Sequence, residues 1–142
     1  VAMDLFSSGK SVLPWSMNQT ACYRIPSLVR TGKGSLLAIV AERLGSCSDD
    51  ARVNIVMRKS TDSGATWAEA TLVLPAGSTK VGRSPWTIVD TVSNRVFVFY
   101  NTDADGCHCN VSMLASSDDG NTWEAPTELP TDAVYGSAVT HG

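Results

Sequence analysis

The stretch Ser60–Trp67 reads STDSGATW, and the stretch Ser116–Trp123, which starts 56 residues later, reads SSDDGNTW. Both follow the pattern S-x-D-x-G-x-T-W, so five positions agree at the same offsets. A repeat with a period of this size is typical of chains built from a stack or ring of similar four-stranded units. The repeat therefore predicts an all-β chain made of β-propeller blades.

The repeated pattern has a local physical cause. Asp and Gly between two β-rich runs suit a tight turn, because such turns need residues that tolerate positive φ. We expect Asp62 and Asp118 to accept backbone N–H bonds across their turns, and Trp67 and Trp123 to restart the next strand and cover the hairpin. Neither repeat carries the alternating oxygen ligands of a calcium loop, so both carboxylates are predicted to be structural.

Two sets of four short strands are predicted from runs bounded by Gly, Asp, Asn or Pro. The first set is 25–30, 36–42, 53–59 and 67–74, and the second is 86–90, 95–100, 110–115 and 123–129. We accordingly divide the chain into a lead-in strand (1–22), a first blade (23–76), a second blade (77–130) and the start of a third blade (131–142). Two antiparallel blades cannot close a ring, because a closed propeller needs about four or more.

Composition excludes several function classes. The chain has 142 residues, a net charge of −3 and 43% hydrophobic residues. It has no basic stripe of the kind that binds nucleic acid, and no apolar run approaches the roughly 20 residues of a membrane span. The first residue is Val1 and no basic-then-apolar leader precedes it, so we expect a segment of a longer protein.

Three further features accompany the repeats. Arg24-Ile25-Pro26 opens the first predicted blade, Glu42-Arg43 ends its second strand, and Asp49 lies 11 residues before the first repeat. Together with the two repeats, these features resemble the sialidase (neuraminidase) superfamily, whose propellers carry such Asp-box or BNR repeats. The resemblance spans about Tyr23 to Trp123.

The resemblance implies a partial six-bladed propeller belonging to an exo-α-sialidase, a retaining glycoside hydrolase that removes terminal sialic acid from a glycoconjugate and needs no cofactor. Arg24 would be one of three arginines that bind the sugar's carboxylate, which suits the bidentate, permanently charged guanidinium. Arg43 would contact the substrate beside its ring hydroxyls, and Asp49 would be the acid/base. The family carries the tyrosine nucleophile, its glutamate and the other two arginines on later blades, so this chain alone is expected to be inactive.

Alternatives remain at several of these positions. Asp50 competes with Asp49 for the acid/base role, and Arg43 could be a solvated or salt-bridged loop residue. Arg83-Ser84-Pro85-Trp86 stands where the family often has an N-P-x-P segment, so Trp86 could stack on the sugar or simply pack inside its blade. A trans-sialidase, or a non-catalytic Asp-box propeller that binds carbohydrate or protein, are alternative functions.

Four cysteines allow three pairings if all are oxidised. Cys22 with Cys47 is an attractive pair because both flank the proposed pocket segments. Cys107-His108-Cys109 is too closely spaced to wrap one tetrahedral ion, so zinc is disfavoured and no metal is predicted. The cysteines are either loop disulfides or buried thiols, and a secreted, cell-surface or lysosomal-type location is expected.

Overall fold

The computed structural model describes residues 3–13, 19–77, 83–104 and 107–130, and for residues 83, 103–104 and 107–109 it describes the backbone alone. Eight strands form two four-stranded antiparallel sheets, each in sequence order. The first sheet contains β1 (Ala21–Arg30), β2 (Leu36–Leu44), β3 (Arg52–Ser60) and β4 (Thr71–Leu74). The second contains β5 (Arg83–Asp90), β6 (Arg95–Ala104), β7 (Cys107–Ser116) and β8 (Thr127–Glu128). The all-β prediction is confirmed, with two blades whose ring is not closed.

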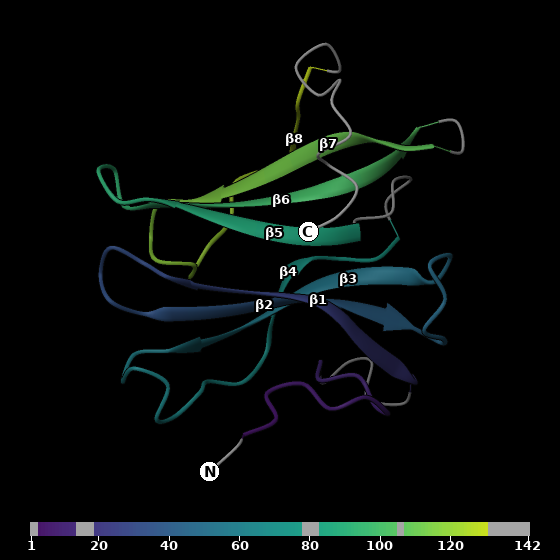
Figure 1. Cartoon of the computed structure of the whole chain (residues 1–142), viewed down its shortest axis with the longest axis horizontal. Helices are drawn as coiled ribbons and strands as arrows, with labels where there is room; N and C mark the ends of the chain where they lie inside the picture. Colours follow the sequence, from purple (N-terminus) through teal and green to yellow (C-terminus); the bar gives the residue numbers. More distant parts are fainter. Residues whose placement is uncertain (1–2, 14–18, 78–82, 105–106, 131–142) are drawn as a thin grey trace.

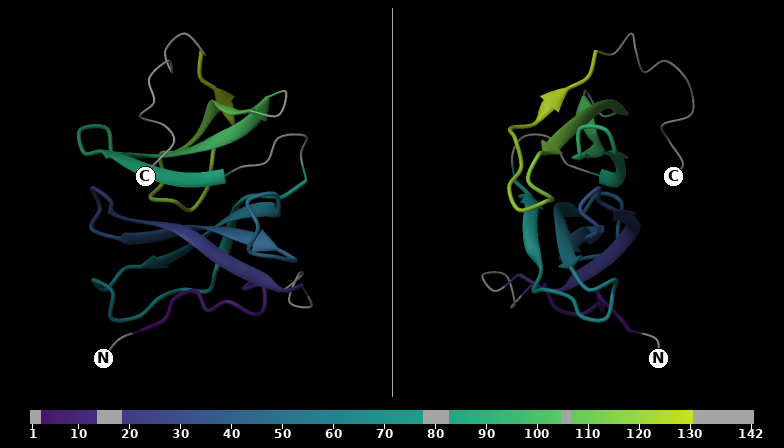
Figure 2. Two further views of the ribbon diagram at one scale, coloured as in Figure 1. Left: turned by 45° about the vertical axis from the view of Figure 1, so that its right-hand side comes forward. Right: turned by 90° about the vertical axis from the view of Figure 1, so that its left-hand side faces the viewer.

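The two sheets are stacked face to face. Figure 1 shows the second sheet on one face of the first, and the N-terminal segment, in purple, on the other face. The two views in Figure 2 show the same order of layers. Alternation along each strand puts every second side chain between the sheets. The buried core between them comprises Leu37, Ile39, Ile55, Met57, Val73, Leu74, Val96, Val98, Tyr100 and Leu114.

Both Asp-box turns have the expected hydrogen bonds. Asp62 Oδ1 accepts the backbone N–H of Thr66 at 2.8 Å, and Asp118 Oδ1 accepts that of Thr122 at the same distance. The threonine hydroxyls donate to the other carboxylate oxygens, and this is the main reason why the pKa of both aspartates falls to about 2. Positive φ occurs in each turn, at Ser63-Gly64 and at Asp119-Gly120. The carboxylates are therefore structural, as predicted.

The fourth strand of each blade begins later than predicted. The indole N–H of Trp67 donates to the carbonyl of Gly64 in its own turn, at 3.2 Å, so this side chain folds back over the hairpin. Pairing of β4 with β3 then starts only at Thr71. In the second blade, β8 is confined to Thr127–Glu128. Trp67 therefore covers its turn as expected, and in both blades the tryptophan precedes the fourth strand instead of starting it.

The second Asp-box also docks on the first blade. Lys59, near the end of β3, forms an ion pair with Asp119 at 2.7 Å, and Ser35 Oγ donates to the same carboxylate oxygen at 2.7 Å. The Lys59 ammonium also donates to the Asp119 carbonyl and to Asn121 Oδ1. Gly32 packs so closely on the Asn94 side chain that an added Cβ would lie 1.7 Å from its oxygen. These polar contacts fix one blade against the next at the turn end of the sheets.

The lead-in segment covers the outer face of the first sheet. Of its described residues, 3–13 and 19–20 form no strand, whereas 21–22 begin β1, and Gly9 exchanges backbone hydrogen bonds with Ala21. Leu13 is fully buried against Val40 and Val56. A lead-in strand that serves another blade stays a prediction, and the predicted start of a third blade lies outside the described residues.

Candidate active site

The Arg-Ile-Pro motif interrupts the regular pairing of β1 with β2. Ile25 has a φ of 56°, a conformation that is rare for a β-branched residue, and the register shifts between Arg24 and Ser27. Before this bulge, Cys22 lies opposite Arg43 and Tyr23 lies opposite Glu42. Successive side chains of a strand point to opposite faces, so Cys22 and Arg24 share one face with Arg43.

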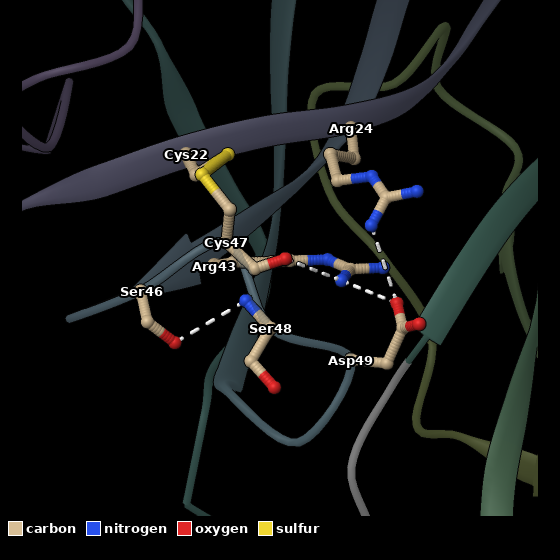
Figure 3. Close-up of a disulfide and its surroundings, with 7 residues drawn as sticks. All are labelled: Cys22, Arg24, Arg43, Ser46, Cys47, Ser48 and Asp49. Carbon is tan, nitrogen blue, oxygen red and sulfur yellow. Dashed lines mark hydrogen bonds and ion pairs between the residues drawn. A yellow bond between two sulfur atoms is a disulfide. The ribbon is translucent and has the colours of Figure 1, made fainter.

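Three of the four predicted site residues meet on this face. Arg24 Nη1 lies 3.3 Å from Asp49 Oδ1, and Arg43 Nη1 lies 2.5 Å from the same oxygen. Both guanidinium groups are directed at this one carboxylate in Figure 3. The Arg24 side chain is 45% exposed and that of Asp49 is 73% exposed, whereas that of Arg43 is 5% exposed. The Asp49 carboxylate, which is accessible, therefore contacts an accessible guanidinium (Arg24) and a buried one (Arg43).

The Asp49 loop is attached to the sheet by a disulfide. Cys22 in β1 is bonded to Cys47, which lies in the loop between β2 and β3. The Cys47 carbonyl accepts a hydrogen bond from Arg43 Nη1 at 3.0 Å (Figure 3). The structure thus contains the Cys22–Cys47 pair, one of the pairings that the sequence left open, while the side chains of Cys107, His108 and Cys109 lie outside the described residues.

Trp86 lies in β5 and does not need a ligand to explain its place. It pairs with Phe99 across the strands, and the two rings stack at a centroid distance of 5.7 Å. Its side chain is half-buried. Of the two alternatives for Trp86, packing inside its blade is observed, and a contact with the sugar stays a prediction.

The segment Arg83-Ser84-Pro85 repeats the Arg-x-Pro motif of the first blade, a likeness that the sequence analysis did not predict. Arg83-Ser84-Pro85 stands 59 residues after Arg24-Ile25-Pro26. Ser84 has a φ of 49°, and the β5–β6 register shifts there, as the β1–β2 register does at Ile25. Comparing the two blades position by position would have found this signal. The repeat therefore extends from the Asp-boxes to the first strand of each blade.

A tyrosine–glutamate pair lies on the opposite face of the same sheet. The Tyr23 hydroxyl donates to Glu42 Oε1 at 2.8 Å, and Glu42 is fully buried. Ser11 Oγ, the Val12 N–H and the Asn54 amide also donate to this carboxyl group. Burial, followed by the bond to Glu42, raises the pKa of the Tyr23 phenol well above its usual range. This pair anchors the lead-in segment and is poorly suited to act as a nucleophile.

The described part of the chain contains no cluster of three or more His, Cys, Asp or Glu residues that could hold a metal ion. The same described residues include no helix long and apolar enough to cross a membrane.

The sequence model of a protein family, the BNR repeat-like domain, matches residues 32–142 of this chain. The chain belongs to the BNR repeat-like domain family. Among the relatives of this BNR repeat-like chain, a sialidase from Bacteroides fragilis (strain YCH46) is 34% identical over 137 residues, which cover 79% of this chain and 25% of the relative.

Two solved sialidase structures are similar to this chain. The Hadza microbial sialidase Hz136 has a TM-score of 0.65 and 26% sequence identity, covering 78% of this chain and 26% of that chain. The NanB sialidase from Streptococcus pneumoniae has a TM-score of 0.72 at 12% identity, covering 90% of this chain and 38% of that chain, and this similarity concerns the fold. The BNR repeat-like chain therefore spans about a quarter to two fifths of the length of these three relatives.

Proposed function

We propose that the full-length protein containing this chain is an exo-α-sialidase that removes terminal sialic acid from glycoconjugates. The observation that carries the proposal is the convergence of Arg24 and Asp49, whose side chains are 45% and 73% exposed and whose charged atoms lie 3.3 Å apart. An anionic sugar bound to the guanidinium would bring its glycosidic oxygen near a carboxyl group. The Arg-Ile-Pro bulge and the sialidase relatives support the same interpretation.

Each residue has a separate task in the proposed reaction. Arg24 binds the substrate carboxylate, for which its exposed guanidinium is free to exchange its Asp49 partner. Asp49 donates a proton to the leaving oxygen and then takes one from the attacking water, as a retaining mechanism requires. Arg43 is proposed to assist substrate binding, and Trp86 is proposed to line the sugar site. The nucleophile would come from another part of the full-length protein.

The disulfide supports an oxidising location. Cys22–Cys47 bridges two segments of the first blade, and such bonds persist chiefly in secreted, cell-surface and lumenal proteins. We therefore propose a location outside the reducing cytosol, where sialylated glycoproteins, glycolipids and oligosaccharides would be the substrates.

The experiment is sialic acid release from sialyllactose by the full-length protein. Asp49→Asn is expected to lower kcat by about 100-fold or more, because general acid–base catalysis contributes on that scale. Arg24→Lys is expected to act mainly on KM, because an ammonium cannot bind a carboxylate bidentately. Asp50→Asn is the matched control and should retain activity. A wild-type protein that binds sialyllactose without cleaving it would instead identify a non-catalytic binding module, and lactose-dependent sialyl transfer would identify a trans-sialidase.

A further inference from the structure

We propose that the Cys22–Cys47 disulfide and Arg43 together form a device that positions the carboxyl group of Asp49. This inference rests on the proposed function, because it concerns the acid/base of that reaction. It assigns a catalytic purpose to the disulfide and a positioning role to Arg43.

Packing does not hold the loop that carries Asp49. Every residue from Gly45 to Asp50 is exposed, so no burial of side chains restrains this segment. The Gly45 N–H bonds to the Thr20 carbonyl at 2.8 Å, which fixes the loop at its start. The Ala51 N–H bonds to the Ser48 carbonyl at 3.2 Å, a contact within the loop itself. A catalytic carboxyl group on such a loop needs a further restraint, since catalysis depends on its placement within a fraction of an ångström.

The disulfide supplies that restraint in the middle of the loop. It joins Cys47, two residues before Asp49, to Cys22, which is held in the ladder of β1 and β2 directly opposite Arg43. The covalent bond thereby brings the Cys47 carbonyl within 3.0 Å of Arg43 Nη1. Cys22, at one end of the disulfide, is fixed by strand pairing, and Cys47, at the other end, lies in the exposed loop.

Arg43 binds both the backbone of the loop and the Asp49 carboxyl group. The same Nη1 atom that donates to the Cys47 carbonyl also donates to Asp49 Oδ1, at 2.5 Å. Because the Arg43 side chain is 5% exposed, its guanidinium has little freedom to follow a moving loop. Arg24, with 45% exposure, contacts the same oxygen from the accessible side. Arg43 is thus placed to hold the acid while Arg24 remains available to the substrate.

A misplaced acid has a distinctive kinetic effect. A sugar leaving group must receive a proton as the glycosidic bond breaks, whereas an aryl leaving group departs as a stabilised anion. Asp49 also takes a proton from water in the second step, which is the same for both substrates, so the comparison uses kcat/KM, which reports only the steps up to departure of the leaving group. Loss of positioning should therefore lower kcat/KM for sialyllactose much more than for an aryl sialoside. General destabilisation of the fold would slow both reactions to the same extent.

The test compares the full-length wild type with Cys22→Ser/Cys47→Ser. We expect kcat/KM for sialyllactose to fall by about 10- to 100-fold, while kcat/KM for 4-methylumbelliferyl sialoside changes little. Amide hydrogen exchange over residues 45–50 should become faster in the variant. Leu114→Ala, which truncates a buried side chain of the second blade, is the control for lost stability and should affect both substrates equally.

Equal slowing of both substrates by the double serine variant would overturn the inference, as would unchanged hydrogen exchange over the loop. A wild type that cleaves neither substrate would refute the proposed function. The exchange measurement would then still decide whether the disulfide restrains the loop.

Discussion

The ion pair between Lys59 and Asp119 is predicted to stabilise the packing of the two blades by an amount that a surface ion pair cannot match. The ammonium and carboxylate lie 2.7 Å apart, and their side chains are only 17% and 10% exposed. Their gross Coulomb attraction is about 6 kcal/mol at an effective dielectric constant of roughly 20. Desolvation offsets part of this attraction, although removing one partner from a buried pair still costs about 3–5 kcal/mol.

We expect the low end of that range for Asp119→Asn, about 3 kcal/mol, because Lys59 retains the Asp119 carbonyl and Asn121 as partners. Asparagine is the suitable replacement, since Asp119 has a φ of 68° and asparagine tolerates this conformation. In a double-mutant cycle with Lys59→Met, the coupling energy should be about 2 kcal/mol. Urea unfolding followed by tryptophan fluorescence measures each free energy, and the midpoint for Asp119→Asn should fall by roughly 1–3 M.

The matched control is the pair of Arg95 and Glu124 within the second blade. Its nitrogen–oxygen distance is also 2.7 Å, but its side chains are 37% and 54% exposed. The cycle of Arg95→Met with Glu124→Gln should give a coupling energy below about 1 kcal/mol, and salt should reduce it further. Equal coupling energies for the two pairs would refute the argument that burial between blades gives Lys59–Asp119 its strength.

Acid should weaken the Asp-box turns, because the pKa of Asp62 and of Asp118 is about 2 in the folded chain against an ordinary 3.8. Their stabilisation is complete above the ordinary value and is lost as pH falls toward 2, so Asp62→Asn/Asp118→Asn should flatten the dependence of the unfolding free energy on pH in that window. Tyr23→Phe removes a hydroxyl that bonds to buried Glu42 and should lower the unfolding free energy by about 2 kcal/mol, measured by urea unfolding. The 142-residue chain alone should not hydrolyse a fluorogenic sialoside, and turnover that disappears with Asp49→Ala would contradict this expectation.

Turn chemistry was the most predictable part of the fold. The Asp-box residues form their hydrogen bonds within four positions of one another, so the sequence pattern contains both donor and acceptor. The order of the strands could also be predicted, because each repeat lies between the third and fourth strands of its blade. Pairing of Cys22 with Cys47 was one of several open possibilities, since a disulfide depends on how β1 and the loop after β2 approach each other.

Contacts between the repeats could not be predicted from either repeat alone. Asp119 occupies a variable position of the Asp-box pattern, and its ion pair with Lys59 arises only when two blades stack. The positive φ of Ile25 was equally hidden, because a β-branched residue in a strand is ordinarily extended. The sialidase resemblance alone grouped Arg24, Arg43 and Asp49 in the sequence; their side chains are in contact in the structure, and their roles stay predictions.

Glu42 and Arg43 show how one sheet separates anchoring from the proposed chemistry. The two are adjacent in the sequence, but strand alternation sends Glu42 into the buried cluster with Tyr23 and sends Arg43 toward Asp49. A register slip of one residue would exchange these faces and leave a buried carboxyl group without its donors. The cost of that loss opposes the slip, so the polar cluster on the outer face helps to hold the arginines of the opposite face in place. Substitutions at Tyr23 should therefore disturb the Arg24–Asp49 geometry through the strand itself, although the phenol lies on the far side of the sheet.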